Sequence, residues 1–425
     1  MMQKVIRTLN FAAASCLVLL LITTSIWQPV NPEDAIRPAT RPYEFDYFAW
    51  TLDALWDKVS MAGLGINHYL SFYQDRQIIK EYFTLLQDNE NLKNEIEKLY
   101  SDPDVEDPKL ESSAMQVELQ SNQKKLDQQS SLAETVIQKQ ISITLDRLGL
   151  TSLRQPFPPV LYHSTELPKE LIVSRRDVIE QVTSVSLQAN MNLDQMTALE
   201  DEVEADSNYS ALVVDVGGVG TYPTMVISTS SISYLIETVA HEWTHNYLNL
   251  RPLGMHYSSS PELRTMNETT ASIAGDEISQ AVTRFFYADL LDTPNTPYKT
   301  YEAKYVVESP PAGRWVNVDF HQEMYQTRVH VDELLAAGQI DEAENYMEER
   351  RQLFWSQGFS IRKLNQAYFA FHGAYADQEY SAAGEDPVGN AVRTLRSRSS
   401  SLADFIKKMS TYSSYDQLAK AVIVF

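Results

Sequence analysis

One short run of residues constrains the fold of this chain more than any other: positions 241–245 read His-Glu-Trp-Thr-His. Apolar residues precede it at helical spacing, and hydroxyl side chains at 229–231 offer N-caps, so we expect a helix over residues 232–250. On a helix, positions i and i+4 share a face about 6 Å apart along the axis, so His241 and His245 can bind one divalent ion. Glu242 is badly placed to bind the same ion but well placed to take a proton from a water molecule on it. The alternative is a pair of structural histidines satisfied by hydrogen bonds.

A third ligand must come from histidine or a carboxylate. The only cysteine, Cys16, lies in an N-terminal apolar stretch, which excludes a disulfide or a thiolate metal site from the folded part. A catalytic zinc usually has three protein ligands and one position open to water. We favour Glu268, because the stretch that follows it is rich in small residues and can pack closely on the first helix. The other acidic candidates downstream are Glu262, Asp276 and Glu277.

A histidine motif followed by an Asn-Glu pair that opens a second helix resembles the gluzincin metallopeptidases, the class that includes thermolysin. In this chain Glu268 follows His245 by 23 residues (268 − 245). The resemblance implies a zincin-like core and one Zn²⁺ ion held by His241, His245 and Glu268. It also implies hydrolysis of peptide bonds, with Glu242 as the catalytic general base.

This resemblance covers residues 211–290 and departs from the family at one position. Ser272 stands where these enzymes often have an aspartate that orients a zinc-bound histidine, and Asp276 is a candidate substitute. The longer metzincin form of the motif is excluded, because Leu248 and Arg251 replace the glycine and histidine that it requires.

A second stretch, residues 364–375, is faintly similar to the end of a family of predicted bacterial aminopeptidases that also carry the histidine motif. Zincin-type peptidases commonly place a tyrosine or histidine opposite the zinc, where it stabilises the oxyanion. The candidates for this role are His256, Tyr257, His330, His372 and Tyr375.

The N-terminus predicts a membrane attachment. Lys4 and Arg7 precede an uncharged run from Leu9 to Trp27, and the first acidic residue, Glu33, follows it. The run is near the lower length limit for a spanning helix, and the positive flank predicts a cytoplasmic N-terminus. We therefore expect a signal anchor over residues 1–28, single-pass in the cell membrane, with the rest of the chain extracytoplasmic. The alternative is a cleaved signal peptide.

The net charge argues against nucleic acid and anionic lipid surfaces as partners. With 35 basic and 57 acidic residues the chain has a formal charge of −22 and no segregated basic patch, so nucleic acid and anionic lipid surfaces would be repelled. The partners that we expect are a peptide or protein substrate and, through the N-terminal helix, the membrane.

Between the anchor and the motif, the pattern predicts three segments. Prolines among polar residues predict an extended linker at 29–46, and amphipathic periodicity predicts a helical region at 47–150, interrupted near 101–104. Its Gln- and Ser-rich part, 116–131, indicates either a solvated helical hairpin or a weak coiled coil. Residues 151–425 form the expected metallopeptidase domain.

Short apolar runs predict strands at 159–162, 170–174, 211–216 and 222–228, with the glycine cluster 217–220 as a turn between the last two. Helices follow near 267–291, 318–335, 341–354 and 360–375, with one or two more before the C-terminus. The fold class is therefore α+β: mostly helical, with a small sheet packed on the histidine-motif helix.

These observations predict a membrane-anchored zinc peptidase. The alternative function is a non-enzymatic envelope protein with a zincin-like fold, which binds partners through its N-terminal helices. The long helical region and the acidic composition motivate that alternative, whereas a complete motif with its general base argues for the enzyme.

Overall fold

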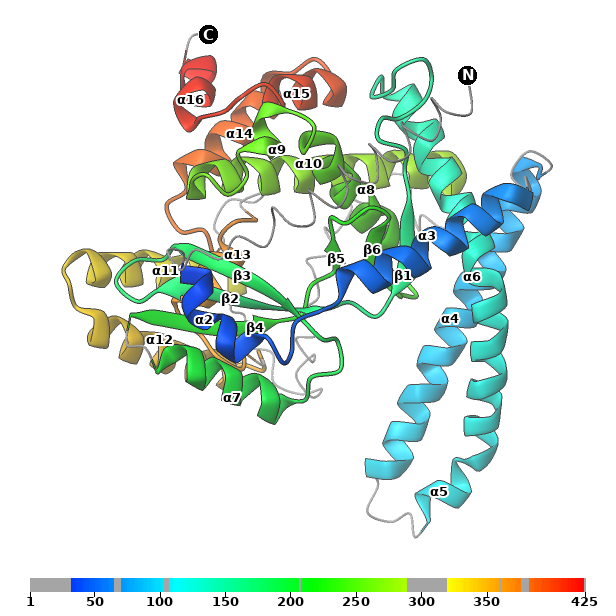
Figure 1. The fold of residues 1–425 in the computed structure, drawn as a ribbon, viewed down its shortest axis with the longest axis horizontal. Helices are drawn as coiled ribbons and strands as arrows, with labels where there is room; N and C mark the ends of the chain where they lie inside the picture. Colours follow the sequence, from blue (N-terminus) through cyan, green and yellow to red (C-terminus); the bar gives the residue numbers. More distant parts are fainter. Residues whose placement is uncertain are drawn as a thin grey trace, which may run out of the picture. The chain divides into compact units, whose positions relative to one another are not determined.

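The computed structural model describes residues 32–64, 70–101, 107–205, 208–288, 319–359, 361–375 and 382–423 (Figure 1). Residues 1–42 and 43–425 form two separate units, and nearly all of the described residues belong to the second. The expected signal anchor lies outside the described residues. None of the helices in the described ranges has the length and apolar character that crossing a membrane requires.

The first described element is a helix where the prolines predict an extended linker. Helix α2 runs over Pro32–Thr40, so the prediction of an extended chain is wrong for these residues. Pro32 occupies the first helical position, where its missing N–H costs no hydrogen bond and its fixed φ suits a helix.

The helical region expected after the linker forms α3 (Tyr47–Leu64), α4 (Phe72–Ser101), α5 (Pro108–Glu111) and α6 (Ser113–Arg147). Helices α4 and α6 lie side by side as a long hairpin (Figure 1). Helix α4 ends at Ser101, as the break predicted at 101–104 indicates. The Gln- and Ser-rich part of α6 is largely exposed, whereas its C-terminal part buries Val136, Ile141 and Leu145 in the main core.

In the described residues the strands form two three-stranded sheets, where the sequence predicts one small sheet. One has the order β1-β6-β5 and contains β1 (Tyr162–Thr165), β5 (Gly218–Val219) and β6 (Thr224–Ile227). The other has the order β3-β2-β4 and contains β2 (Lys169–Arg175), β3 (Gln181–Leu187) and β4 (Tyr209–Val214). Strand β1 pairs in parallel with β6, whereas the other pairings are antiparallel.

Only the first sheet packs on the histidine-motif helix α8 (Ile232–Leu248). The second sheet contacts α7 (Leu193–Glu204) through β4, and α13 (Gln366–His372) lies against β2 and β4. The prediction omits β3 and α7. Helix α7 nevertheless begins with a complete capping box, in which the side chains of Asn192 and Gln195 each accept the other's backbone N–H.

The remaining helices pack around one long helix, α10 (Pro261–Phe286), or form a separate pair. Helix α10 packs along α8, with the short α9 (Pro252–Met255) between them in the sequence. Helices α14 (Pro387–Arg398), α15 (Leu402–Met409) and α16 (Tyr415–Ile423) cover α10, while α11 (Phe320–Ala336) and α12 (Ile340–Ser356) form a pair with its own small core. The fold class is α+β and mostly helical, as predicted. Helix α13 is shorter than the predicted helix over 360–375.

Candidate metal centre

Helix α8 forms where the sequence predicts it. The Ser231 side chain caps it by accepting the Tyr234 N–H, as expected for hydroxyl residues before an apolar helical run. Apolar side chains such as Ile236 and Val239 are buried in the main core, which fixes the rotation of the helix. His241 and His245 consequently lie one turn apart on the side that faces α10.

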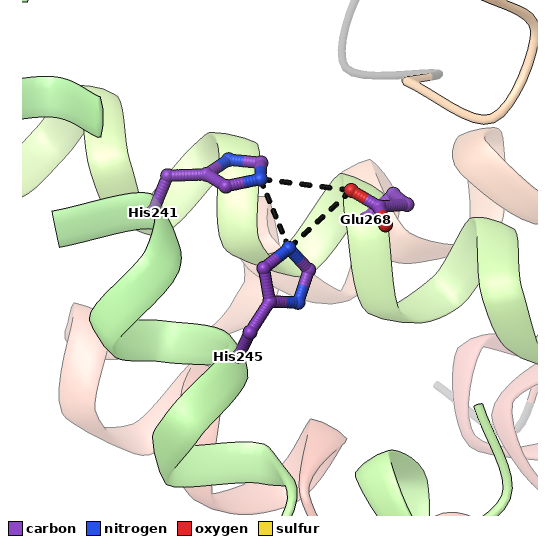
Figure 2. A group of neighbouring side chains, drawn as sticks. All are labelled: His241, His245 and Glu268. Carbon is purple, nitrogen blue, oxygen red and sulfur yellow. Dashed lines mark hydrogen bonds and ion pairs between the residues drawn. The ribbon is translucent and has the colours of Figure 1, made fainter. Parts of the chain in front are cut away.

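The two imidazoles converge with a carboxylate from α10 (Figure 2). The Nε2 atoms of His241 and His245 lie 3.0 Å apart. Glu268 Oε2 lies 3.6 Å from His241 Nε2 and 3.4 Å from His245 Nε2. These three ligand atoms form a group that could hold a metal ion, and it contains the three residues predicted as ligands.

Glu268 reaches this position from the second turn of α10 and not from its start. The prediction that the Asn-Glu pair opens the helix is wrong: α10 begins at Pro261 and is capped by Ser260, whose side chain accepts the Leu263 N–H. Proline is favoured at the first helical position and serine at the cap, so this boundary has an ordinary sequence signal.

Close packing of α8 and α10 depends on a glycine. A Cβ atom at Gly275 would lie 3.0 Å from the Glu237 carbonyl oxygen and 3.1 Å from His241 Cβ. Such distances are tighter than ordinary contacts, so a side chain here would push the helices apart. The expectation that small residues allow close approach is thereby confirmed at this position.

The donor set fits a divalent cation. Glu268 is 5% exposed, and its Oε2 is a buried atom without a hydrogen-bond partner, while its Oε1 accepts a hydrogen bond from the Tyr257 hydroxyl. Burial opposes ionisation of Glu268, but the charges of His245 and His241 outweigh it and hold its pKa well below the usual range. A buried carboxylate oxygen without a hydrogen bond is costly unless a cation compensates it. Two imidazoles and a carboxylate are a common ligand set for zinc.

The side chain that orients His245 is Asn267, which the sequence analysis did not assign to this role. Its Oδ1 lies 2.8 Å from His245 Nδ1, and the residue is fully buried. With Nδ1–H donated to this oxygen, Nε2 is the nitrogen that would bind a metal ion once its own proton is displaced. Asp276, the candidate substitute, accepts hydrogen bonds from Gln280 instead.

Glu242 is buried against two glycines, Gly218 and Gly220. A Cβ atom at Gly218 would lie 2.8 Å from Glu242 Oε1, and one at Gly220 would lie 3.3 Å from its Oε2. The glycine cluster predicted as a turn therefore contains β5, which passes directly over this carboxyl group. Burial raises the pKa of Glu242, although the charges of His241 and His245 oppose this shift.

Two of the predicted oxyanion candidates flank the histidines. The Tyr257 ring lies 6.3 Å from that of His245, and the Tyr375 ring lies 6.2 Å from that of His241, measured between centroids. Arg264, which was not predicted, donates to the Tyr257 hydroxyl and to the Ala370 carbonyl oxygen.

The other candidates have different surroundings. His256 is exposed and contacts the Pro252 carbonyl oxygen, and His330 pairs with Glu333. The His372 ring lies against that of Tyr368, tilted by 48° with centroids 4.1 Å apart, and burial lowers the pKa of His372 to about 3. Of the acidic alternatives to Glu268, Glu262 is exposed, and Glu277 forms a two-pronged ion pair with Arg396 on α14.

Comparisons of the chain with protein-family models, with curated proteins and with solved structures found no match.

Proposed function

We propose that this chain is a zinc-dependent peptidase of the gluzincin type. The observation that carries the proposal is the convergence of His241 Nε2, His245 Nε2 and the buried Glu268 Oε2, which accepts no hydrogen bond, on one point. A bound zinc ion would polarise the substrate carbonyl and acidify a water molecule. His241, His245 and Glu268 would hold that ion, and the buried Glu242 would accept the proton of the attacking water and pass it to the leaving amine.

Two further features support a peptide as substrate. Strand β5 lies at the edge of its sheet, paired only with β6 among the described strands, so an extended peptide could pair with its free edge beside Glu242. Tyr375 lies next to His241, and its hydroxyl group could donate a hydrogen bond to a developing oxyanion, whereas the Tyr257 hydroxyl already donates to Glu268 Oε1.

The test compares the native chain with Glu242→Gln and Glu268→Gln. We expect the native chain and Glu242→Gln to bind one equivalent of zinc by elemental analysis, and Glu268→Gln to bind it more weakly. Only the native chain should cleave a mixed peptide library, read by mass spectrometry. If the native chain cleaves nothing that Glu242→Gln spares, the peptidase assignment is wrong. Zinc binding without cleavage would then favour a non-enzymatic partner-binding protein.

Membrane attachment is a second part of the proposal. The apolar run from Leu9 to Trp27 and its basic flank support a single-pass anchor with the site on the extracytoplasmic side. Carbonate extraction of membranes from cells that express the full chain tests this. An anchored chain stays in the pellet, whereas release into the supernatant would refute the anchor.

A further inference from the structure

A hollow of about 520 Å³ lies between the α4–α6 hairpin and the segment that joins β6 to α8, and no residue of the candidate metal centre lines it. Its volume is within the range of about 300–1,000 Å³ that is usual for small-ligand sites. Side chains on one face of α4 and one face of α6 form two of its walls, and β1 contributes His163 and Ser164. The hollow therefore contacts three separate parts of the fold.

The lining of the hollow contains a buried amide without hydrogen-bond partners. Asn89 on α4 is 4% exposed, and neither its Nδ2 nor its Oδ1 has a hydrogen-bond partner. Tyr82 and Leu126, both also buried, lie beside it in the lining. Leaving a carboxamide buried and unpaired costs free energy. A buried, unpaired carboxamide in the lining of a hollow therefore indicates a ligand that forms hydrogen bonds with it.

The lining is rich in groups that both donate and accept hydrogen bonds. Gln123 adds a second carboxamide. Hydroxyl groups come from α6, from β1 and from the segment before α8, namely Ser130, Ser164, Ser228, Thr229 and Ser230. A ligand dense in hydroxyl groups would match such a surface, because each hydroxyl group is also both donor and acceptor.

The charges around the hollow argue against an ionic ligand. Lys93 lies on the rim together with Glu90 and Asp127, so an anion and a cation would each meet a group of like charge. Glu90 already accepts a hydrogen bond from the Ser230 hydroxyl, which ties the hairpin to the segment before α8. A neutral ligand avoids the repulsion.

The backbone argues against a peptide in this hollow. Strand β1 is an edge strand, but α6 occupies its outer side. The Ser164 N–H donates to Glu134 Oε1 at 2.7 Å, and Gln138 Nε2 donates to the Tyr162 carbonyl oxygen. The main-chain groups that strand addition would require are therefore in use.

We propose that this hollow binds a neutral oligosaccharide through the Asn89 carboxamide and the surrounding hydroxyl groups. The inference is independent of the proposed peptidase activity, because none of its residues belongs to the candidate metal centre.

The test uses the full chain and four neutral disaccharides: cellobiose, maltose, lactose and N,N′-diacetylchitobiose. Saturation-transfer NMR at millimolar sugar should detect binding of at least one of them. Asn89→Leu should weaken that binding about tenfold or more, since two hydrogen bonds are lost. It should also raise the midpoint of urea unfolding, because the unpaired amide is removed.

Matched variants separate a binding role from a structural one. Gln123 is exposed, so Gln123→Ala should fold normally and still weaken sugar binding. Asn94→Leu changes an exposed asparagine on the same helix outside the hollow and should leave binding unchanged. The proposal is overturned if none of the four sugars binds. It is also overturned if Asn89→Leu binds like the native chain or lowers the unfolding midpoint, or if N-acetyl-trialanine amide binds in place of the sugars.

Discussion

Gly218 permits the close passage of β5 over the Glu242 carboxyl group, and its replacement tests that geometry. In Gly218→Ala the added Cβ would lie 2.8 Å from Glu242 Oε1, 2.9 Å from Glu242 Cγ and 2.9 Å from Thr238 Cγ2. All three distances are well below ordinary carbon contacts of about 3.5–4.0 Å. Either β5 moves or the Glu242 side chain rotates away, and overpacking of this kind typically costs about 1–3 kcal/mol.

The consequence for activity is larger than the consequence for stability. A misplacement of about 1 Å in a catalytic group can reduce a rate about 100-fold, so we expect kcat/KM for peptide cleavage to fall by about that factor. Zinc content should be unchanged, because Gly218 does not contact the ligand atoms.

Gly220→Ala is the matched control. Its Cβ would lie 3.3 Å from Glu242 Oε2 and 3.7 Å from His245 Cβ, which a small shift can relieve. We expect a reduction of kcat/KM clearly smaller than that of Gly218→Ala. The two variants are compared by peptide cleavage, elemental analysis and urea unfolding. Native-like cleavage by Gly218→Ala would refute the placement of β5 over Glu242.

Three further predictions concern zinc affinity and stability. Asn267→Leu removes the partner of His245 Nδ1 and should weaken zinc binding about 10–100-fold, measured by competition with a chelator. Asn91→Leu, which changes an exposed asparagine, is the control. If Asn267→Leu binds zinc as tightly as the native chain, Asn267 does not orient His245. Removing zinc with a chelator should lower the unfolding midpoint of the native chain but not that of His241→Ala; an equal effect on both would place the zinc elsewhere. Burial raises the pKa of Glu170 from 4.5 to about 7, although the hydrogen bond from Ser186 opposes the shift. Between about pH 4.5 and pH 7 the folded state therefore keeps a proton on Glu170 that the unfolded state has lost. The free energy of unfolding should therefore fall by at most about 3 kcal/mol as pH rises from about 4.5 to 7. Glu170→Gln should remove this fall from free energies measured by urea unfolding at several pH values. If the variant shows the same pH dependence as the native chain, the prediction is wrong.

Local periodicity was sufficient to predict part of the site. The spacing of His241 and His245 places both imidazoles on one helical face, because 3.6 residues complete a turn. The small residues after Glu268 indicated a helix able to pack closely on the first, and α10 does so through Gly275. The same local logic predicted the end of α4 at Ser101 and most of the helices.

Contacts between side chains of different elements depend on how those elements pack, which periodicity does not specify. The sequence offers four acidic candidates for the third ligand, and the rotation of α10 against the core brings Glu268 to the imidazoles while Glu277 turns to Arg396 on α14. The glycine cluster looks like a turn in the sequence, because a two-residue strand such as β5 is specified by its pairing with β6 and not by its own residues. The division into two sheets likewise depends on which strands pair with each other, and no single strand's residues specify that pairing.

The orienting role of Asn267 and the placement of Tyr257 and Tyr375 also required the fold. Asn267 lies next to Glu268 in the sequence, yet its contact with His245 depends on the packing of α10 against α8. Tyr375 comes from a segment 130 residues after His245 (375 − 245). Periodicity describes one element at a time, whereas the register between two packed elements is fixed by all the side chains at their interface.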